Sequence, residues 1–440
     1  MQSFEEYVSE LEGAAQAALN GNESVLRRID VTAALNGAVG AALRERVELS
    51  LLQEKGAFFT GTTLRNQLVE PLLQSDWTNC SVCDPACGAG DLLLSFAEHL
   101  PTAPDLEVTL AEWSHRIHGF DIDPVFVRAA RARLVLAAYS RGARSSGTES
   151  LGLDKVLPHL TVRDSIAGQE LLPSTTHIAL NPPFIQVVAP DDCSWSKGKV
   201  SAAALLLDRC LRDAPVGGRI CAILPDVLRS GSRYADWRKA VESRATIARI
   251  EVYGPFDQHA DVDVFVLDLS IRAQPAPSRP NEDPRWRAAT VAVRTLGDLC
   301  DVSTGAVVPH RHASIGKEFR YLHSRNATPW ATVADISDRR RFSGTVVTPP
   351  MVVIRRTSSP SDRQRPIGTI VLGMQPVAIE NHLLILKPKD DDIATCRAVL
   401  ELLQSSATRH WLNQRIRTRH LTVAAIREIP LALGTASGEV

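Results

Sequence analysis

The chain has 440 residues, of which 44% are hydrophobic and 22% charged, and a formal net charge of -1. This composition excludes a small disulfide-stabilised peptide, a disordered chain and a fibrous protein, and the length predicts two or three domains at roughly 100–200 residues each. No stretch approaches the roughly 18 uncharged apolar residues that span a bilayer, and the start, Met1-Gln2-Ser3-Phe4-Glu5-Glu6, is acidic where a signal peptide is basic. We therefore expect a cytoplasmic protein without membrane association, whose eight scattered cysteines are reduced thiols.

Residues 1–55 contain no proline and repeat apolar residues at helical spacing, as in Phe4-Tyr7-Val8-Leu11, which predicts an N-terminal helical region. In residues 56–273, short apolar runs alternate with helical stretches such as 91–100, 124–139, 202–212 and 233–243. The predicted strands are 81–83, 117–120, 160–162, 177–180, 219–224, 247–252 and 264–269. Strands separated by helices indicate β-α-β crossovers, so we predict an α/β fold with a mainly parallel, doubly wound sheet covered on both faces.

A glycine loop follows the first of these strands and opens a helix, in the segment Cys83-Asp84-Pro85-Ala86-Cys87-Gly88-Ala89-Gly90-Asp91. Gly88 and Gly90 permit a tight turn and the close approach of a ligand, and the helix start offers free N–H groups. The loop therefore fits a nucleotide-like ligand. It lacks the third glycine of the dinucleotide fingerprint, which argues against NAD.

Carboxylates stand at the ends of the next two predicted strands, where Asp121 and Asp164 follow them. At the carboxyl edge of a doubly wound sheet, an acid in this position can accept the protons of both ribose hydroxyls of a nucleotide. Asp121 is the natural candidate. Asp123, two residues on, could instead cap the helix that begins at Pro124.

The tetrapeptide Asn181-Pro182-Pro183-Phe184 follows the fourth predicted strand. Two prolines stiffen the backbone and donate nothing, which leaves the Asn181 side-chain oxygen and the Pro182 carbonyl as aimed acceptors. Phe184 adds a flat apolar face. Acceptors beside an aromatic platform suit an aromatic ring with an exocyclic amine, as methylation of a flipped adenine requires.

Beyond this domain, residues 274–289 are rich in proline and predict a linker. Residues 290–433 follow as a second, mixed domain, with strands at 346–356 and 377–388 and a helix at 393–409, and 434–440 form a tail. From Thr290 to the end there are 20 Lys and Arg against 13 Asp and Glu, an excess of seven positive charges, whereas the remainder has an excess of eight negative charges. A basic domain points weakly to a polyanionic partner such as nucleic acid.

With these motifs, the chain resembles a known family, the γ-class amino-methyltransferases of DNA that act on adenine N6 in bacterial restriction-modification systems. The resemblance runs from about Lys55 to Ile271, in the family's motif order. It implies the class I S-adenosylmethionine-dependent methyltransferase fold, with S-adenosylmethionine as cofactor and no metal. Gly56–Thr60 looks like the motif that closes over the methionine end of the cofactor, Asp84–Gly90 like the main cofactor loop, and Asn181–Phe184 like the catalytic tetrapeptide.

The same resemblance implies roles for single residues. Asp121 would hold the ribose, Asp164 would face the cofactor adenine and Thr60 would bind the cofactor carboxylate, with Ile122 and Ser165 as further cofactor-binding residues. The loop residues that it implies are Asp84, Ala86, Cys87, Gly88 and Gly90, and the catalytic ones are Asn181, Pro182, Pro183 and Phe184. Phe256 matches the aromatic that supports the flipped base from its other face. The family usually has Thr-Pro where this chain has Thr60-Gly61, so the backbone there is less constrained.

A vaguer resemblance covers Leu296 to Pro430, which looks like a target-recognition domain of the kind found in type I specificity subunits. His310-Arg311-His312 fits an exposed basic loop against DNA phosphate. Cys80, Cys83 and Cys87 with two nearby histidines superficially resemble a zinc site. They lie in a strand and the glycine loop and have no second cysteine pair, so we expect no zinc.

We interpret the chain as a site-specific DNA methyltransferase that modifies N6 of a flipped-out adenine in double-stranded DNA. It would serve restriction-modification or phage defence, with a cognate restriction endonuclease as a possible partner. Alternatives keep the fold and change the acceptor, to cytosine N4, an RNA base or a protein glutamine. A further alternative is a non-catalytic DNA-binding subunit that retains the cofactor pocket, which the intact Asn181–Phe184 and Gly88–Gly90 segments disfavour.

Overall fold

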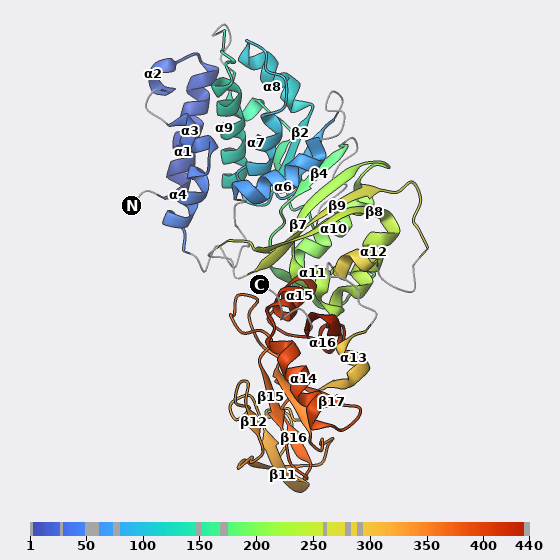
Figure 1. Cartoon of the computed structure of the whole chain (residues 1–440). Coiled ribbons are helices and arrows are strands. Elements are labelled where there is room, and N and C mark those ends of the chain that lie inside the picture. Colours follow the sequence, from blue (N-terminus) through green and yellow to red (C-terminus); the bar gives the residue numbers. More distant parts are fainter. Residues whose placement is uncertain are drawn as a thin grey trace. The chain divides into compact units, whose positions relative to one another are not determined.

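Figure 1 shows the computed structural model of the chain, in which we describe residues 3–26, 30–48, 61–73, 80–146, 151–167, 175–257, 262–277, 283–287 and 294–434. The chain divides into two compact units, Met1–Asp283 and Pro284–Val440, which we describe separately. The division falls inside the stretch 274–289 expected as a linker, and the short helix η4 (Pro284–Arg287) belongs to the second unit. Within the described ranges, no helix is long and apolar enough to cross a bilayer.

The N-terminal unit is built on a seven-stranded sheet in the order β3-β2-β1-β4-β7-β9-β8. Its strands are β1 (Val82–Asp84), β2 (Ile117–Asp121), β3 (Leu160–Val162), β4 (His177–Leu180), β7 (Arg219–Pro225), β8 (Ala245–Pro255) and β9 (Asp263–Ile271). β9 runs antiparallel to β7 and β8, and the other neighbours pair in parallel. Every residue of β4 is buried, as expected of a parallel strand covered on both faces. The mainly parallel α/β sheet predicted from the sequence is confirmed.

The connecting helices show where the direction of the crossovers changes within the sheet. They are α7 (Asp91–Ala97), α8 (Leu106–Ser114), α9 (Pro124–Ser140) and α10 (Ala202–Asp213), with α11 (Asp226–Ser230) and α12 (Ala235–Arg244) after β7. From β1 the chain moves outward through β2 to β3, and from β4 it moves the opposite way to β7 (Figure 1). Right-handed crossovers in opposite directions put their helices on opposite faces, so the adjacent strands β1 and β4 form the topological switch point. Ligands bind beyond the carboxyl ends of such strands.

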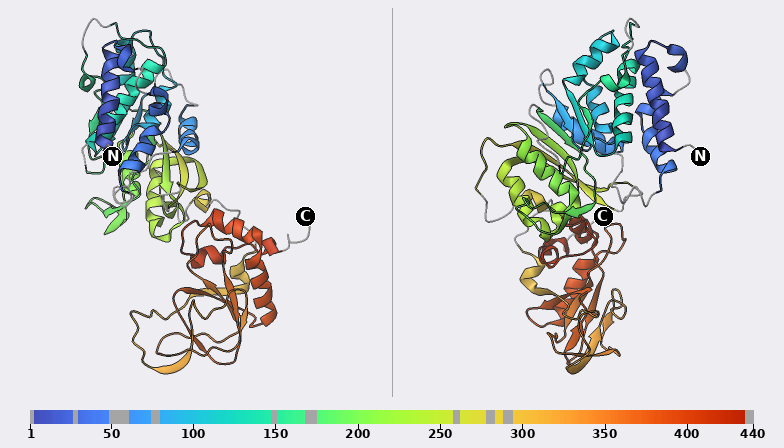
Figure 2. Two further views of the ribbon diagram at one scale, coloured as in Figure 1. Left: turned by 90° about the vertical axis from the view of Figure 1, so that its left-hand side faces the viewer. Right: turned by 180° about the vertical axis from the view of Figure 1, so that it is seen from behind.

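Further helices precede the sheet, in the region that the periodicity predicts to be helical. They are α1 (Phe4–Leu19), α2 (Glu23–Leu26), α3 (Val31–Leu35) and α4 (Ala38–Arg46), followed by α6 (Thr62–Leu73). A capping box between Ser3 and Glu6 begins α1. Figure 2 shows α1 lying alongside α9, against which it packs. Arg128 of α9 forms ion pairs with Glu5 and Glu12 of α1.

The C-terminal unit combines two sheets with helices. The larger has the order β10-β17-β14-β15-β12 and the smaller β13-β11-β16. The strands are β10 (Cys300–Thr304), β11 (Lys317–Leu322), β12 (Thr332–Val333), β13 (Arg339–Phe342), β14 (Met351–Arg355), β15 (Gly368–Val371), β16 (Val377–Ile379) and β17 (Leu383–Pro388). The helices α13 (Leu296–Leu299), α14 (Ile393–Gln404), α15 (Ser406–Arg415) and α16 (Val423–Arg427) contribute side chains to a core shared with the larger sheet.

Three predicted elements of this unit differ from the structure. The strand expected at 346–356 is shorter, because only β14 forms a strand there, and the one expected at 377–388 is divided into β16 and β17. The helix expected at 393–409 is two helices. Ser405 has an extended backbone (φ -64°, ψ 143°) and its hydroxyl accepts the Thr408 N–H at 3.0 Å, so it caps α15 instead of continuing α14.

Candidate functional site

The glycine loop joins β1 to α7 at the switch point. Gly88 and Gly90 have φ values of 49° and 84°, in the left-handed region that glycine adopts without strain. A Cβ on Gly90 would lie 3.0 Å from the Ala130 Cβ of α9, so the two helices approach closely because residue 90 has no side chain. The Cys87 N–H donates to the Phe120 carbonyl at 2.8 Å and ties the loop to β2.

Two carboxylates border this loop, one buried and one half-buried. Asp84, which ends β1, is 1% exposed and its Oδ1 accepts the Ala86 N–H at 3.1 Å. Asp121, which ends β2, accepts the N–H groups of Gly88 and Asp123, each at 2.9 Å. The Asp123 side chain accepts the Val125 N–H at 3.0 Å, so it caps α9. The sequence left open whether Asp123 binds a ribose or caps a helix, and in the structure it caps α9.

The electrostatics of these carboxylates favour a particular kind of ligand. Burial raises the pKa of Asp84 well above its ordinary value, the Ala86 hydrogen bond partly opposes this rise, and the charge of Asp121 adds to it. Burial also raises the pKa of Asp121, against its hydrogen bonds from Asp123 and Gly88. Two desolvated carboxyl groups beside one loop gain from a ligand that brings positive charge and hydroxyl donors. S-adenosylmethionine carries a sulfonium, an ammonium and a ribose diol, so these residues fit it.

The end of β3 adds a polar turn beside Asp121. Asp164 Oδ1 accepts the N–H groups of Ile166 and Ala167 at 2.9 and 3.1 Å. Ser165 is 6% exposed, and its hydroxyl has no hydrogen-bond partner among the described residues. Ile122, next to Asp121, is 69% exposed. An unsatisfied hydroxyl and an exposed aliphatic side chain at one sheet edge suit a flat ligand with polar edges.

The tetrapeptide lies across the switch point from the glycine loop. Asn181 directly follows β4, and β4 pairs with β1 in parallel, so both segments leave the same edge of the sheet. Pro182 is buried. Phe184 meets Phe256 edge to face, with ring centroids 5.3 Å apart and planes at 86°. A base can therefore stack between these rings only after they separate, because a base between two rings needs one stacking distance on each of its faces, and the sum of the two exceeds this centroid distance.

Phe256 comes from the turn between β8 and β9. It is 7% exposed, and its N–H donates to the Val262 carbonyl at 2.9 Å. The sequence places Phe256 more than 70 residues after Phe184, and the fold brings their rings into contact. Their roles toward a substrate base stay a prediction.

Arg133 of α9 is a site residue that the sequence analysis missed. It is 0% exposed and forms an ion pair with Asp91 at 2.8 Å. Its Nη1 donates to the Ala89 carbonyl at 2.6 Å and its Nε to the Ala34 carbonyl of α3 at 2.9 Å. A signal was available, because Arg133 stands among the apolar residues of a buried helix face, where a lone arginine needs fixed partners.

Some predicted site residues cannot be compared with the structure. Thr60 and the rest of Gly56–Thr60 lie outside the described residues. In the described ranges, no group of three or more histidines, cysteines or acids could hold a metal ion. The eight cysteines, all of which lie in the described ranges, are not joined by disulfides.

Comparisons with known proteins agree with this geometry. Residues 49–247 match the family described as N-6 DNA Methylase. No curated protein matches the chain. A solved structure of the type IIL restriction-modification enzyme MmeI in complex with DNA has 14% identity and a TM-score of 0.56, and the alignment covers 89% of this chain and 70% of that one. At this identity the likeness establishes the fold alone.

Two further solved structures have lower TM-scores. One is a putative class I S-adenosylmethionine-dependent methyltransferase from Listeria monocytogenes, with 17% identity, a TM-score of 0.42 and coverage of 64% of this chain and 84% of that one. The other is a modification subunit of a putative type I restriction enzyme from Vibrio vulnificus, with 21% identity, a TM-score of 0.35 and coverage of 50% and 45%. The seven-stranded, mostly parallel sheet and the likeness to MmeI agree with the predicted class I S-adenosylmethionine-dependent methyltransferase fold, and residues 49–247 match a DNA methylase family.

Proposed function

We propose that this chain transfers a methyl group from S-adenosylmethionine to the exocyclic N6 amine of an adenine flipped out of double-stranded DNA. The observation that carries the proposal is the juxtaposition of Asn181–Phe184 and the Asp84–Gly90 loop at one switch point. The match of residues 49–247 to N-6 DNA Methylase supports DNA as the substrate. The likeness to MmeI, a restriction-modification enzyme, supports a role in such a system, in which a cognate endonuclease would be the partner.

The chemistry asks little of the protein beyond position and polarity. An exocyclic amine conjugated to its ring is a poor nucleophile, because its lone pair is delocalised. The Asn181 side-chain oxygen and the Pro182 carbonyl accept hydrogen bonds from the two amine N–H groups and draw the lone pair out of conjugation, and one of these protons leaves to solvent after the methyl group has moved from sulfur to nitrogen. When bound, S-adenosylmethionine supplies the electrophilic methyl group. Asp121 accepts its ribose hydroxyls, Ile122 and Ser165 border the adenine, and the loop from Asp84 to Gly90 fixes its position.

Phe184 and Phe256 form the platform for the flipped base in this proposal. Their edge-to-face contact at 5.3 Å buries both rings in part, and a base would replace that contact with two stacking contacts. Lifting a base out of the duplex costs a few kcal/mol, which stacking offsets in part. The base thus exchanges one aromatic environment for another.

The second unit supplies DNA recognition in the same proposal. Its excess of seven positive charges beyond Thr290 suits the phosphate backbone, and side chains of a separate domain are needed to read base edges in a groove. We assign catalysis to residues 56–273 and recognition to 290–433.

The proposal is tested by incubating the full chain with radiolabelled S-adenosylmethionine and DNA from a methylation-free host, then hydrolysing the DNA to nucleosides. We expect label in N6-methyl-2′-deoxyadenosine, and little or none with the Asn181→Ala variant. Label in N4-methyl-2′-deoxycytidine would identify cytosine as the acceptor, and label in RNA or in protein glutamine, when these are supplied in place of DNA, would identify that acceptor instead. Cofactor binding without transfer to any of them would identify a non-catalytic subunit.

A further inference from the structure

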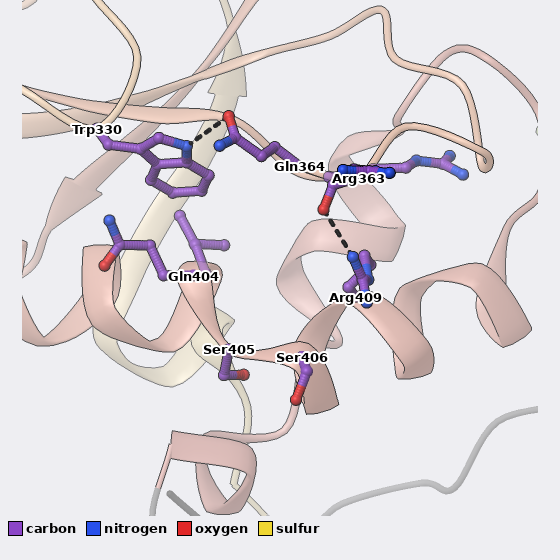
Figure 3. A pocket seen from close by; sticks show the side chains of 9 residues that line it. Trp330, Arg363, Gln364, Gln404, Ser405, Ser406 and Arg409 are labelled. Carbon is purple, nitrogen blue, oxygen red and sulfur yellow. Dashed lines mark hydrogen bonds between the residues drawn. The ribbon is translucent and has the colours of Figure 1, made fainter.

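A pocket in the C-terminal unit lies far along the chain from the methyltransferase site. It encloses about 260 Å³ between the segment at residues 363–365, the side chain of Trp330 and the junction of α14 with α15. Its lining residues are Trp330, Arg363, Gln364, Arg365, Leu403, Gln404, Ser405, Ser406 and Arg409. Three of these are arginines, and none is an acid. Figure 3 shows Trp330 and Arg409 on opposite sides of this set of lining residues.

The lining of this pocket contains no acidic side chain that would neutralise its arginines. Arg409 Nη1 donates to the Arg363 carbonyl at 2.6 Å, which holds its guanidinium at the wall. Arg365 is 2% exposed and donates to two neutral acceptors, Asn413 Oδ1 at 3.0 Å and the Thr418 carbonyl at 2.8 Å. Among the ion pairs of the described residues, none involves Arg363 or Arg409. The guanidinium groups of Arg363 and Arg409, with no ion pair among the described residues, favour an anion, and phosphate matches their fork of donors.

One wall of the pocket is the indole ring of Trp330, which hydrogen bonds fix in place. Trp330 Nε1 donates to Gln364 Oε1 at 3.1 Å, and the Trp330 N–H donates to the Gly368 carbonyl at 2.7 Å. Its φ is +59°, a left-handed conformation that bulky residues rarely adopt and that costs free energy. The surrounding contacts therefore hold the indole in one orientation beside the arginines. The cavity is also larger than an isolated phosphate needs, so the bound molecule has room for a ring next to the indole.

We propose that this pocket binds a phosphorylated nucleoside, with its phosphate on Arg363 and Arg409 and its base against Trp330. The ligand can be a free mononucleotide or a nucleotide unit of a DNA strand, because both present the same phosphate and ring. The proposal does not depend on methyl transfer, since the pocket belongs to the other unit.

The experiment measures binding to the full chain by calorimetry, with thymidine 5′-monophosphate as the probe. A pyrimidine nucleotide avoids the adenosine-shaped site of the N-terminal unit. Thymidine without phosphate and inorganic phosphate are run beside it, and a DNA duplex forms the second arm. The variants are Arg363→Gln, whose side chain is exposed and whose loss should not affect folding, and Arg409→Gln. Arg397→Gln is the matched control, because Arg397 is an exposed arginine of α14 outside the pocket lining.

We expect thymidine 5′-monophosphate to bind and thymidine not to bind. Each pocket variant should weaken binding about tenfold or more, as for one lost hydrogen bond between charged groups, while Arg397→Gln leaves it unchanged. Trp330→Leu should reduce the advantage of the nucleotide over inorganic phosphate. If the pocket variants weaken only duplex binding, the nucleotide belongs to DNA and the proposal holds in that form. If neither ligand distinguishes the pocket variants from Arg397→Gln, the proposal is wrong, whatever the outcome for methyl transfer.

Discussion

The guanidinium of Arg133 lies 2.8 Å from the carboxylate of Asp91, the first residue of α7. The same side chain donates to the Ala89 carbonyl inside the glycine loop and to the carbonyls of Ala34 and Leu35 at α3. One buried arginine of α9 thus joins the N-terminal helices to the loop that we assign to the cofactor. A displacement of α3 would therefore move Arg133 and, through its hydrogen bond to Ala89, disturb that loop.

Arg133→Met should destabilise the N-terminal unit and weaken cofactor binding. The substitution leaves the Asp91 carboxylate and three carbonyls without their donor, and breaking a buried pair on one side typically costs about 3–5 kcal/mol. Denaturant unfolding gives the free energy, and calorimetry at a temperature where the variant is folded gives the affinity. Arg128→Gln, on the same helix, removes a half-exposed pair with Glu5 and Glu12 and should cost at most about 1 kcal/mol. Equal effects of the two variants would refute the role of Arg133.

Asn181→Ala should abolish most methyl transfer while retaining cofactor and DNA binding. It removes one acceptor for the amine protons and leaves the loop and the aromatic platform intact. The loss of a single polarising group typically lowers turnover about 100- to 1000-fold. Single-turnover kinetics at saturating cofactor and DNA measure this step. Near-normal turnover would reject the assignment.

Asp121→Asn should weaken S-adenosylmethionine binding by about 1.5–3 kcal/mol, the range for hydrogen bonds to a charged group. The N–H groups of Gly88 and Asp123 donate to different oxygens of Asp121, so asparagine keeps one of the two acceptors and disturbs the loop less than alanine does. Turnover at saturating cofactor should largely recover. Asp123→Ala is the control, because it removes the cap on Val125 and leaves the Asp121 carboxylate in place, and it should cost about 1 kcal/mol of stability. Unchanged affinity in a folded Asp121→Asn protein would contradict the ribose role.

Sequence patterns predicted the elements whose causes are local. Gly88, Gly90 and the cap at Asp123 follow from backbone conformation and hydrogen bonding within a few residues. Contacts between distant segments were accessible only through a resemblance, as for Phe184 with Phe256, or were missed, as for Arg133. A helix periodicity also does not reveal that Ser405 caps a new helix, because serine inside an apolar repeat is compatible with both outcomes.

Asp84→Asn should flatten the pH dependence of stability. Burial raises the pKa of Asp84 well above its ordinary 3.8, so the folded protein keeps this proton to higher pH than the unfolded chain does. The stabilisation is fully present below 3.8 and is lost as pH rises through the raised pKa. Asparagine does not titrate and still accepts the Ala86 N–H. Urea unfolding between about pH 4 and pH 8 should therefore show a steeper fall for the native sequence. Parallel profiles would mean that Asp84 is not protonated in this window.

The last prediction concerns the division of work between the two units. If the C-terminal unit provides phosphate contacts and base readout, the affinity of the full chain for DNA should fall steeply with salt, because each neutralised phosphate releases counterions. A shortened chain that ends at Asp283, the boundary of the first unit, should have a shallower slope and no sequence preference, yet should still bind S-adenosylmethionine. Fluorescence anisotropy on target and scrambled duplexes at several salt concentrations measures both quantities, after circular dichroism has shown that the shortened chain is folded.

Single substitutions in the full chain sharpen this test, because they avoid truncation. Lys317, Arg339 and Arg341 are exposed on the paired strands β11 and β13 of the three-stranded sheet, and strands of a sheet can enter a groove of DNA. If one of these side chains contacts a phosphate, its glutamine variant should weaken target and scrambled duplexes alike and reduce the salt slope by about one. If it reads a base, the variant should instead weaken the target alone. Retention of target preference by the shortened chain would transfer recognition to the N-terminal helices or to a partner subunit, since the basic unit would then add affinity without adding selectivity.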